Sequence, residues 1–457
     1  DRNVLIHVKG EYAQEDINPI PNVVPGLREW VGLEGSFIVD ADTRIAAESE
    51  DAYQAALQLR SYLSEMSDIS VEIVREGARE GDIVLNQDAT LSDELDEEGY
   101  LIHVGDQIVI DAPAYTGLLY GGVSISQILY QDEMHARVPK GIIRDYPEYS
   151  VRGGMHDVAR KYFSLDYIEE MGRYMAWFKL NTLHLHINED SGLGGEYSSS
   201  FVVESKKYPQ LNTYNGEYVW SQDDYRQMQK DLKKVGIDVV TEIDTPGHAT
   251  IFQLIDPEIV NGSNFDLSNH YDECLALIED VFDEFLDGED PVFQNAVVHI
   301  GTDESANTNE NMRRYINDLA QYCLAKDNID EVYFWGNLSL YYGFNEIDPD
   351  HVAAQVWDSA DQRVDEALAS GFDVINSTSN SLYLIPGNAN GLHNGYVDMS
   401  TFYETWDGVT DFDTNRQSNP SYISNRNYYC AYDLLLGDPQ ILGAIYCNWN
   451  DRSWAND

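Results

Sequence analysis

Basic residues are scarce in this chain of 457 residues, in which 28 Lys and Arg stand against 80 Asp and Glu. The formal net charge of -52 argues against binding to a nucleic-acid backbone or an anionic membrane surface, since both attract Lys and Arg. Long apolar runs are lacking too: no stretch of eighteen or more apolar residues occurs, so we expect no membrane span. Nucleic acids and membranes are therefore not expected partners.

Cysteines are also few, and the four present (274, 323, 430 and 447) lie far apart. Their spacing is not that of metal ligands, so we expect buried or unpaired thiols. A Cys430–Cys447 bridge stays open as an alternative, with nothing in the sequence to support it.

What is present is an ordinary globular composition. Hydrophobic residues make up 43% of the sequence, and the length predicts more than one domain or one large barrel with an appendage. Residues 1–148 read as a small α+β domain with a structural role, because no convergent polar groups gather in it. Its expected elements are a helix over 51–66, strands over 71–74, 82–85, 100–104 and 107–110, and a glycine-initiated helix over 121–129.

From residue 149 onward, short apolar runs alternate with helical or irregular segments. Residues 165–178 have the period of an amphipathic helix, and a second helix over 362–370 is closed by Gly371. This alternation predicts a parallel (β/α)8 barrel, the TIM-barrel fold, over residues 149–457. Because the sequence stops shortly after the eighth run, we expect the natural protein to continue. The eight runs are 150–155, 182–187, 237–243, 296–300, 332–335, 352–357, 372–376 and 442–449.

In such a barrel, functional groups lie at the carboxyl ends of the strands. Those ends carry carboxylates, tryptophans, a tyrosine and an arginine, which together indicate a sugar site: aromatic faces stack on pyranose rings, and charged groups hydrogen-bond to hydroxyls. Singly, each has a simpler explanation, since a lone Trp is usually core and Arg152 would also suit an ion pair with Asp157. The candidates are Arg152, Asp190, Glu242, Asp244, His248, Asp303, Glu304, Trp335, Trp357, Tyr383, Trp449 and Asp451.

Two histidines, His184 and His186, occupy alternate positions of the second run. They fit either core histidines or an HxH metal pair. We favour the core, because no third ligand of zinc type stands out nearby, and we expect neither a metal nor a cofactor.

Two adjacent carboxylates, Asp303 and Glu304, follow the β-branched run 296–300. Neighbouring side chains of a strand point to opposite faces, so two acids in a row do not serve one buried face within a strand. We place them where the strand gives way to a loop, with both groups turned toward a pocket.

The barrel half resembles glycoside hydrolase family 20, the β-N-acetylhexosaminidases and lacto-N-biosidases. The resemblance covers about residues 149–451, and residues 1–148 look like the family's usual N-terminal domain. Trp335, Trp357, Tyr383, Trp449 and Asp451 fall in the family's order. The matching motifs are Arg152–Arg160 (RGGMHDVAR), Leu183–Asp190 (LHLHINED), Glu242–Ala249 (EIDTPGHA) and His299–Glu304 (HIGTDE).

The resemblance implies roles for these residues. Glu304 is the expected general acid/base, with a pKa raised by a neighbouring carboxylate and aromatic walls. Asp303 is expected to orient the substrate's 2-acetamido group, whose carbonyl oxygen is the nucleophile. Tyr383 would hydrogen-bond the acetamido oxygen. The other expected roles are walls of the acetamide pocket and sugar face (Trp335, Trp357, Trp449), contacts to outer hydroxyls (Arg152, Asp451) and support of the acid (Asp190, Asp244, His248).

The chain departs from the family pattern at the edge of the site. The family often has Asp two residues after the tyrosine, whereas Tyr383 is followed by Leu384 and Ile385. The sequence after Tyr383 is similar to that of the lacto-N-biosidase branch, whose pocket must admit a galactose. Arg152 argues in the other direction, because it suits a terminal, unextended sugar. Asp451 stands where Glu is commoner.

The leading hypothesis is therefore an exo-acting, retaining β-N-acetylhexosaminidase that hydrolyses terminal β-linked N-acetylhexosamine through an oxazolinium intermediate, with an oligosaccharide or glycoconjugate as its partner. A lacto-N-biosidase is the alternative within the family. Alternatives outside it are a retaining glycosidase with Glu242 or Asp244 as nucleophile, a non-catalytic carbohydrate-binding protein and a metal-dependent hydrolase. The acidity and the substrate class lead us to expect a secreted or cell-surface protein.

Overall fold

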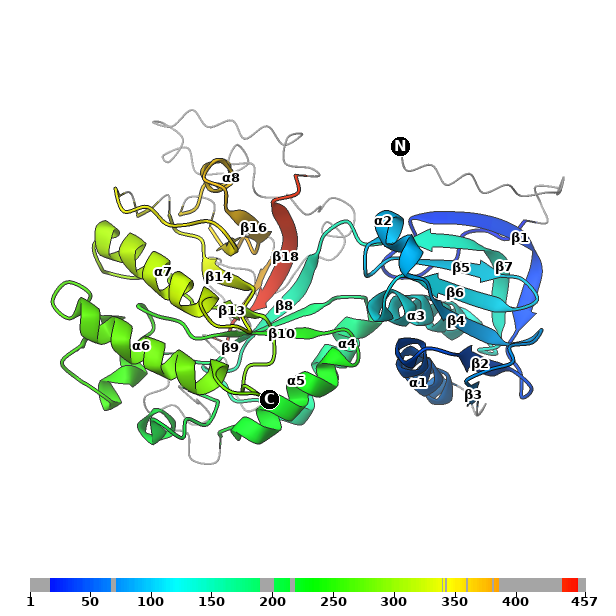
Figure 1. The fold of residues 1–457 in the computed structure, drawn as a ribbon, viewed down its shortest axis with the longest axis horizontal. Coiled ribbons are helices and arrows are strands. Elements are labelled where there is room, and N and C mark those ends of the chain that lie inside the picture. The colour runs from blue at the N-terminus through cyan, green and yellow to red at the C-terminus, as the bar shows by residue number, and fades with distance from the viewer. Residues whose placement is uncertain are drawn as a thin grey trace. The chain divides into compact units, whose positions relative to one another are not determined.

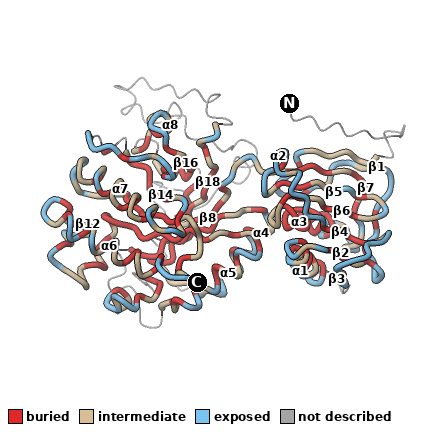
Figure 2. Tube along the Cα trace, in the orientation of Figure 1, coloured by how far each residue is buried: buried red, intermediate tan, exposed pale blue. Residues whose placement is uncertain are grey.

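The computed structural model describes residues 17–66, 71–189, 201–213, 218–338, 340–341, 343–358, 361–379, 382–385 and 438–450. The chain forms two compact units (Figure 1): residues 1–148 with two short segments, 176–179 and 234–236, and the remainder. Each unit has a buried interior (Figure 2). Among the described residues, no helix has both the length and the apolar character of a membrane span.

The first unit is a seven-stranded mixed sheet with two long helices. Helices α1 (Glu50–Met66) and α3 (Tyr115–Gln131) pack against each other and against the sheet, with η1 (Ala89–Leu91) and α2 (Ser92–Leu95) as short additions. Buried alternate residues such as Ile83 and Leu85 form the core. The strand order is β1 (Glu29–Ile38), β7 (Arg137–Asp145), β5 (Tyr100–Val104), β6 (Ile108–Ala112), β4 (Ile83–Gln87), β2 (Arg44–Ala47) and β3 (Glu72–Val74).

The expected start of helix α3 at Gly121 is wrong, because the helix begins six residues earlier at Tyr115. Its glycines lie in the helix interior, at places where the helix approaches the sheet closely. A Cβ on Gly121 would lie 2.5 Å from the Cγ2 of Ile110, and one on Gly117 would lie 2.3 Å from the carbonyl oxygen of Gly99. These glycines therefore permit close packing and do not mark a helix start.

The second unit is the predicted barrel. Strand β18 pairs with both β8 and β16, which closes eight parallel strands into a ring, and β17 (Tyr383–Leu384) adds to the far half of β18. Each of the eight strands of the ring overlaps one of the eight predicted runs. The barrel strands are β8 (Val151–Asp157), β9 (Thr182–His186), β10 (Asp238–Glu242), β13 (Val297–His299), β14 (Glu331–Trp335), β15 (Val352–Val356), β16 (Asp373–Asn376) and β18 (Ile441–Asn448).

Helices follow most of these strands, and both predicted barrel helices are present as α4 and α8. The described residues between β14 and β15 form hydrogen-bonded turns but no α-helix. Cys274, Cys323 and Cys447 are free, buried thiols, and Cys430 lies outside the described residues. The remaining elements are α4 (Leu165–Trp177), η2 (Pro209–Asn212), α5 (Gln222–Lys233), η3 (Thr250–Leu254), β11 (Val260–Asn261), β12 (Asn264–Phe265), α6 (Tyr271–Leu286), α7 (Asn309–Leu324) and α8 (Val364–Ala369).

Candidate active site

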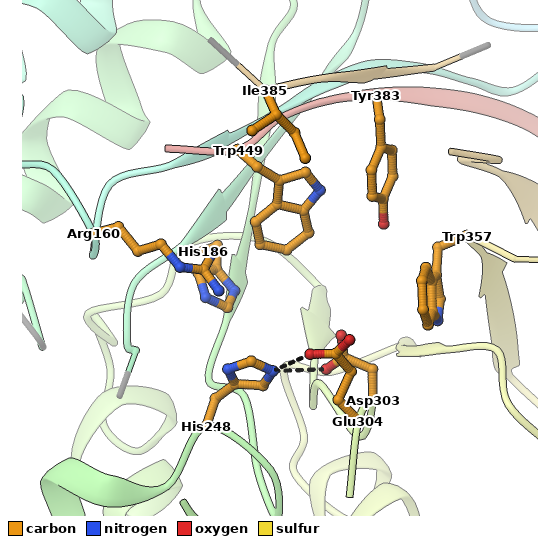
Figure 3. Close-up of a pocket in the computed structure, with 9 residues that line it drawn as sticks. All are labelled: Arg160, His186, His248, Asp303, Glu304, Trp357, Tyr383, Ile385 and Trp449. Atoms are coloured by element: carbon orange, nitrogen blue, oxygen red, sulfur yellow. Dashed lines mark ion pairs between the residues drawn. The ribbon is translucent and has the colours of Figure 1, made fainter. Parts of the chain in front are cut away.

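The two adjacent carboxylates lie in the loop that follows β13. Gly301, Thr302 and Glu304 all have positive φ, at 71°, 92° and 44°. Gly301 is needed here, because a Cβ would lie 2.0 Å from the Oδ1 of Asp244. The turn brings both Asp303 and Glu304 to the wall of one cavity of about 110 Å³ (Figure 3).

The cavity is lined by side chains from strand ends, such as His186 of β9, from β17 and from the loops that follow the barrel strands. Figure 3 shows the carboxylates facing an imidazole on one side and aromatic rings on the others. Among the predicted site residues, the structure brings together Asp303, Glu304, His248, Trp357, Tyr383 and Trp449, and it adds Arg160, His186 and Ile385.

Arg152, expected to contact the sugar, does not line the cavity. It is the second residue of β8, and its Nη1 donates to the carbonyl oxygen of Tyr149 at 2.8 Å. Asp157 at the carboxyl end of the strand is five residues further on, which corresponds to roughly 16 Å of extended chain. Arg152 therefore belongs to the opposite end of the barrel.

Arg160 takes the place that was expected for Arg152. Its guanidinium lies 5.3 Å from the centre of the Trp449 ring and forms ion pairs with Asp157 at 3.0 Å and with Glu189 at 2.5 Å. The signal was present in the sequence, because Arg160 closes the motif that Arg152 opens and follows the strand end, where barrel sites are built.

A chain of charged contacts leads from Glu189 to the candidate acid. Glu189 is fully buried and accepts from His248 Nδ1 at 2.7 Å and from His186 Nε2 at 3.2 Å. His248 Nε2 lies 3.6 Å from Glu304 Oε2 and 3.9 Å from Asp303 Oδ1. Although burial lowers the pKa of His248, the charges of Glu189 and Asp244 outweigh it and raise that pKa well above its ordinary value.

The expected rise in the pKa of Glu304 is contradicted. Its polar contact with the charged His248 lowers the pKa of Glu304, and burial, which acts in the other direction, is the smaller effect because the side chain is 62% exposed. For Asp303 the order is reversed: burial raises its pKa and outweighs the charge of His248. The expectation counted the carboxylate and aromatic neighbours of Glu304 but not an imidazolium beside it.

Asp303 carries the most informative single atom of the site. Its Oδ1 is buried and has no hydrogen-bond partner among the described residues. A buried carboxylate oxygen without a donor is costly, so such an atom beside a cavity indicates a place for a ligand N–H or O–H. Asp244 lies beneath it, with Oδ1 accepting from the amide of Thr302 at 3.0 Å.

The aromatic wall consists of Trp357, Tyr383 and Trp449, with the ring centres of Tyr383 and Trp449 5.9 Å apart. Burial raises the pKa of Tyr383 well above its ordinary value, so the hydroxyl remains a neutral hydrogen-bond donor. It points across the cavity toward the two carboxylates (Figure 3). Trp335, expected in this wall, is fully buried below it and does not line the cavity.

The barrel interior below the site is built around Glu242. Its carboxylate accepts from Trp335 Nε1 at 2.5 Å, from His184 Nε2 at 3.0 Å and from His186 Nδ1 at 2.8 Å. These contacts explain Trp335's burial and agree with the core interpretation of His184, whereas His186 also lines the cavity. They also leave Glu242, the alternative nucleophile, buried and away from the cavity surface.

Three groups of the described residues have donor atoms close enough to share a metal ion. Their donor atoms lie within 4.8 Å of one another, but most of them already hydrogen-bond to each other or to the backbone. The groups are His184 with Glu242 and His299, His186 with Glu242 and Asp244, and Asp244 with His248 and Asp303. Asp190 and Asp451 lie outside the described residues, so their expected roles stay predictions.

Comparison with known proteins finds relatives among the glycoside-cleaving enzymes. A lacto-N-biosidase of Bifidobacterium bifidum is 25% identical over 436 residues, which cover 86% of this chain and 36% of that protein. Beta-hexosaminidase 1 of Coccidioides posadasii is 26% identical over 78% of this chain and 67% of its own length. The chain thus spans between about a third and two thirds of these relatives.

A solved structure, the N-acetyl-beta-hexosaminidase of Streptomyces plicatus, has the same fold, with a TM-score of 0.74 at 20% identity over 95% of this chain and 86% of that one. The sequence itself matches two domain families: glycosyl hydrolase family 20, domain 2, at residues 20–146, and glycosyl hydrolase family 20, catalytic domain, at residues 149–453. A match over this much of the sequence shows that the chain belongs to glycosyl hydrolase family 20.

Proposed function

We propose that the protein is an exo-acting, retaining β-N-acetylhexosaminidase that uses the acetamido group of its substrate as the nucleophile. The observation that supports this most is the buried Oδ1 of Asp303, which has no hydrogen-bond partner among the described residues and lies in an aromatic-walled cavity. An acetamido N–H is a donor of the required kind, and its methyl group suits the apolar faces of Trp357 and Trp449. Terminal β-linked N-acetylhexosamine is the substrate class with both features.

In the first step, the acetamido oxygen attacks the anomeric carbon while Glu304 gives its proton to the glycosidic oxygen, and the leaving sugar departs as an alcohol. Positive charge then develops on the oxazolinium nitrogen, which the Asp303 carboxylate stabilises. Tyr383 donates to the acetamido oxygen and holds it in line. In the second step, Glu304 removes a proton from water, which opens the oxazolinium ring with net retention.

The lowered pKa of Glu304 in the free protein is compatible with this cycle, because a bound substrate changes the surroundings of the Glu304 carboxyl group. A sugar seated over the exposed Glu304 side chain removes water from it, and desolvation raises a carboxyl pKa. His248 and Glu189 then supply the charge that orients the carboxyl group. The proton is thus held most firmly when the glycosidic oxygen is next to it.

Release of a disaccharide, Gal-GlcNAc, is the alternative by the same mechanism. It is favoured by the lacto-N-biosidase relative and by Ile385, an apolar residue in the cavity wall where the family often has Asp. Arg160 favours a single terminal sugar, because its guanidinium occupies the cavity edge beside Trp449 and offers donors to outer hydroxyls. We keep the monosaccharide-releasing activity as the main proposal.

Two substrates separate these activities: nitrophenyl N-acetylglucosaminide and nitrophenyl lacto-N-bioside. The main proposal expects release of nitrophenol from the first. A thiazoline mimic of the oxazoline intermediate should inhibit strongly, whereas it should not inhibit a glycosidase with a protein nucleophile. Asp303→Asn should lower turnover of these acetamido substrates, and unchanged kinetics would refute its role. Binding of the sugar without any product would indicate a carbohydrate-binding protein.

A further inference from the structure

The loop that carries the two acids has an unfavourable backbone. Thr302 and Glu304 have φ values of 92° and 44°, in the left-handed region that residues with a Cβ avoid. Thr is β-branched, which makes its conformation the more costly of the two. Such a backbone persists only where surrounding contacts determine it. The position of Glu304 therefore depends on whatever holds the loop.

Two side chains from the segment after β14 hold this loop, one on each side of the acids. Asn337 Nδ2 donates to the carbonyl oxygen of Thr302, and the Tyr341 hydroxyl donates to the carbonyl oxygen of Ser305 at 2.9 Å. Both side chains are buried, with 2% and 4% of their residues' surface exposed. They bond to the residues immediately before Asp303 and after Glu304.

The segment that carries these side chains is itself well anchored. The amide of Tyr341 donates to the carbonyl oxygen of Asn337 at 3.1 Å, which forms one helical turn and places both side chains on the same side. The amide of Leu340 donates to the carbonyl oxygen of Asp361 at 2.9 Å, which ties the turn to the loop after β15. Neither Asn337 nor Tyr341 lines the cavity, so neither has a direct route to the substrate.

We propose that Asn337 and Tyr341 are positioning residues, the acid clamp, that keep Glu304 within proton-transfer distance of the glycosidic oxygen. This inference rests on the proposed function. Loss of either bond leaves a carbonyl oxygen beside the acids without its partner and lets the loop relax toward an ordinary backbone. Glu304 then moves, while the substrate contacts of Trp357 and Trp449 remain. Proton donation is the step that suffers.

The test uses leaving groups of different acidity, because a poor leaving group needs the proton more than a good one. Tyr341→Phe removes one hydroxyl and keeps the ring. On the full chain, its kcat for N,N′-diacetylchitobiose should fall about five- to tenfold, the effect of one lost hydrogen bond. Its kcat for dinitrophenyl N-acetylglucosaminide should change less than about twofold. KM should stay near that of the wild type for both.

A matched control is Tyr225→Phe, which also removes a buried hydroxyl, the one bonded to Thr241 Oγ1 at 2.6 Å in the barrel wall. It should leave the ratio of the two kcat values unchanged. Asn337→Ala provides a second variant for the clamp and should shift the ratio in the same direction as Tyr341→Phe.

Failure of the clamp proposal can be distinguished from failure of the proposed function. A wild-type protein that cleaves neither substrate, or a Glu304→Gln variant without any leaving-group dependence, would refute the function itself. Wild-type cleavage with the expected Glu304→Gln behaviour, combined with clamp variants whose kcat ratio equals that of Tyr225→Phe, would overturn the clamp. A ratio shifted in both clamp variants but not in the control would support it.

Discussion

Replacing His248 by Gln should raise the pKa of Glu304 and move the alkaline limb of the pH–rate profile. In the structure, the imidazolium Nε2 of His248 lies 3.6 Å from Glu304 Oε2, so it favours the ionised carboxylate and lowers its pKa. Removing the positive charge removes this effect. The buried carboxylate of Glu189 stays nearby, and its negative charge raises the same pKa further.

The size of the shift follows from the distance. Two unit charges 3.6 Å apart interact by about 1 kcal/mol in water and about 5 kcal/mol at an effective dielectric constant of 20. Because the Glu304 side chain is 62% exposed, solvent screens the pair and the lower end applies. We therefore expect loss of the imidazolium to change the free energy of ionisation of Glu304 by roughly 1–2 kcal/mol.

The assay is the pH dependence of kcat/KM on nitrophenyl N-acetylglucosaminide, which reports groups of the free enzyme. We expect the alkaline limb to move to higher pH in His248→Gln, with a lower maximum because Glu304 is less well oriented. His103→Gln, at an exposed position of β5, is the control and should leave the profile unchanged. A limb that stays in place or moves to lower pH in His248→Gln would refute the reasoning.

Other expected outcomes concern both ends of the barrel. Glu304→Gln should lower kcat by about a hundredfold or more, the effect of losing a general acid, and near-normal turnover would show that the acid lies elsewhere. Arg160→Gln should lower kcat/KM by about ten- to a hundredfold through lost charged hydrogen bonds, whereas Arg152→Gln near the start of β8 should change it less than about twofold. Burial and the charge of Asp373 raise the pKa of Glu331 to about 7 from 4.5. The stability that goes with the protonated form is fully present below pH 4.5 and lost as pH rises through 7, so Glu331→Gln should unfold in urea like the wild type at pH 4 and be more stable by roughly 3 kcal/mol at pH 9. A constant difference across pH would contradict this.

The barrel was predictable because most residues of its strands are buried. A run such as 352–356 is buried throughout, is apolar except for Gln355 and is bounded by polar segments, so it stands out without any knowledge of its partners. Strands β1 and β7 of the first unit were missed for the opposite reason. β1 is mostly exposed or half-buried with an irregularity between Gly32 and Ser36, and β7 contains Pro139, so neither shows a clean alternation.

The sequence predicts which residue types form the site, but it does not predict how deeply each side chain is buried or which distant residues it contacts. The sequence places Trp335 at a strand end, yet the direction of its ring depends on the barrel interior, where Glu242 accepts its N–H. Likewise, the pKa of Glu304 depends on His248, which is 56 positions away in the sequence and comes close only through the fold. Spacing along a chain does not reveal such neighbours. The choice between Arg152 and Arg160 could have been made by counting residues along the strand.

Closure of the barrel has a consequence for how the protein is made. Strand β8 lacks its second neighbour until β18 has been synthesised. The two strands are far apart in the sequence, since the bonded residues Ser150 and Leu442 are separated by 292 positions. Until then, β8 and β16 both present unpaired backbone edges, which are templates for pairing with other chains. The emerging polypeptide is therefore most exposed to aggregation just before its last strand is added. Addition of β18 pairs both exposed edges and so removes the sites at which other copies of the chain could add a strand.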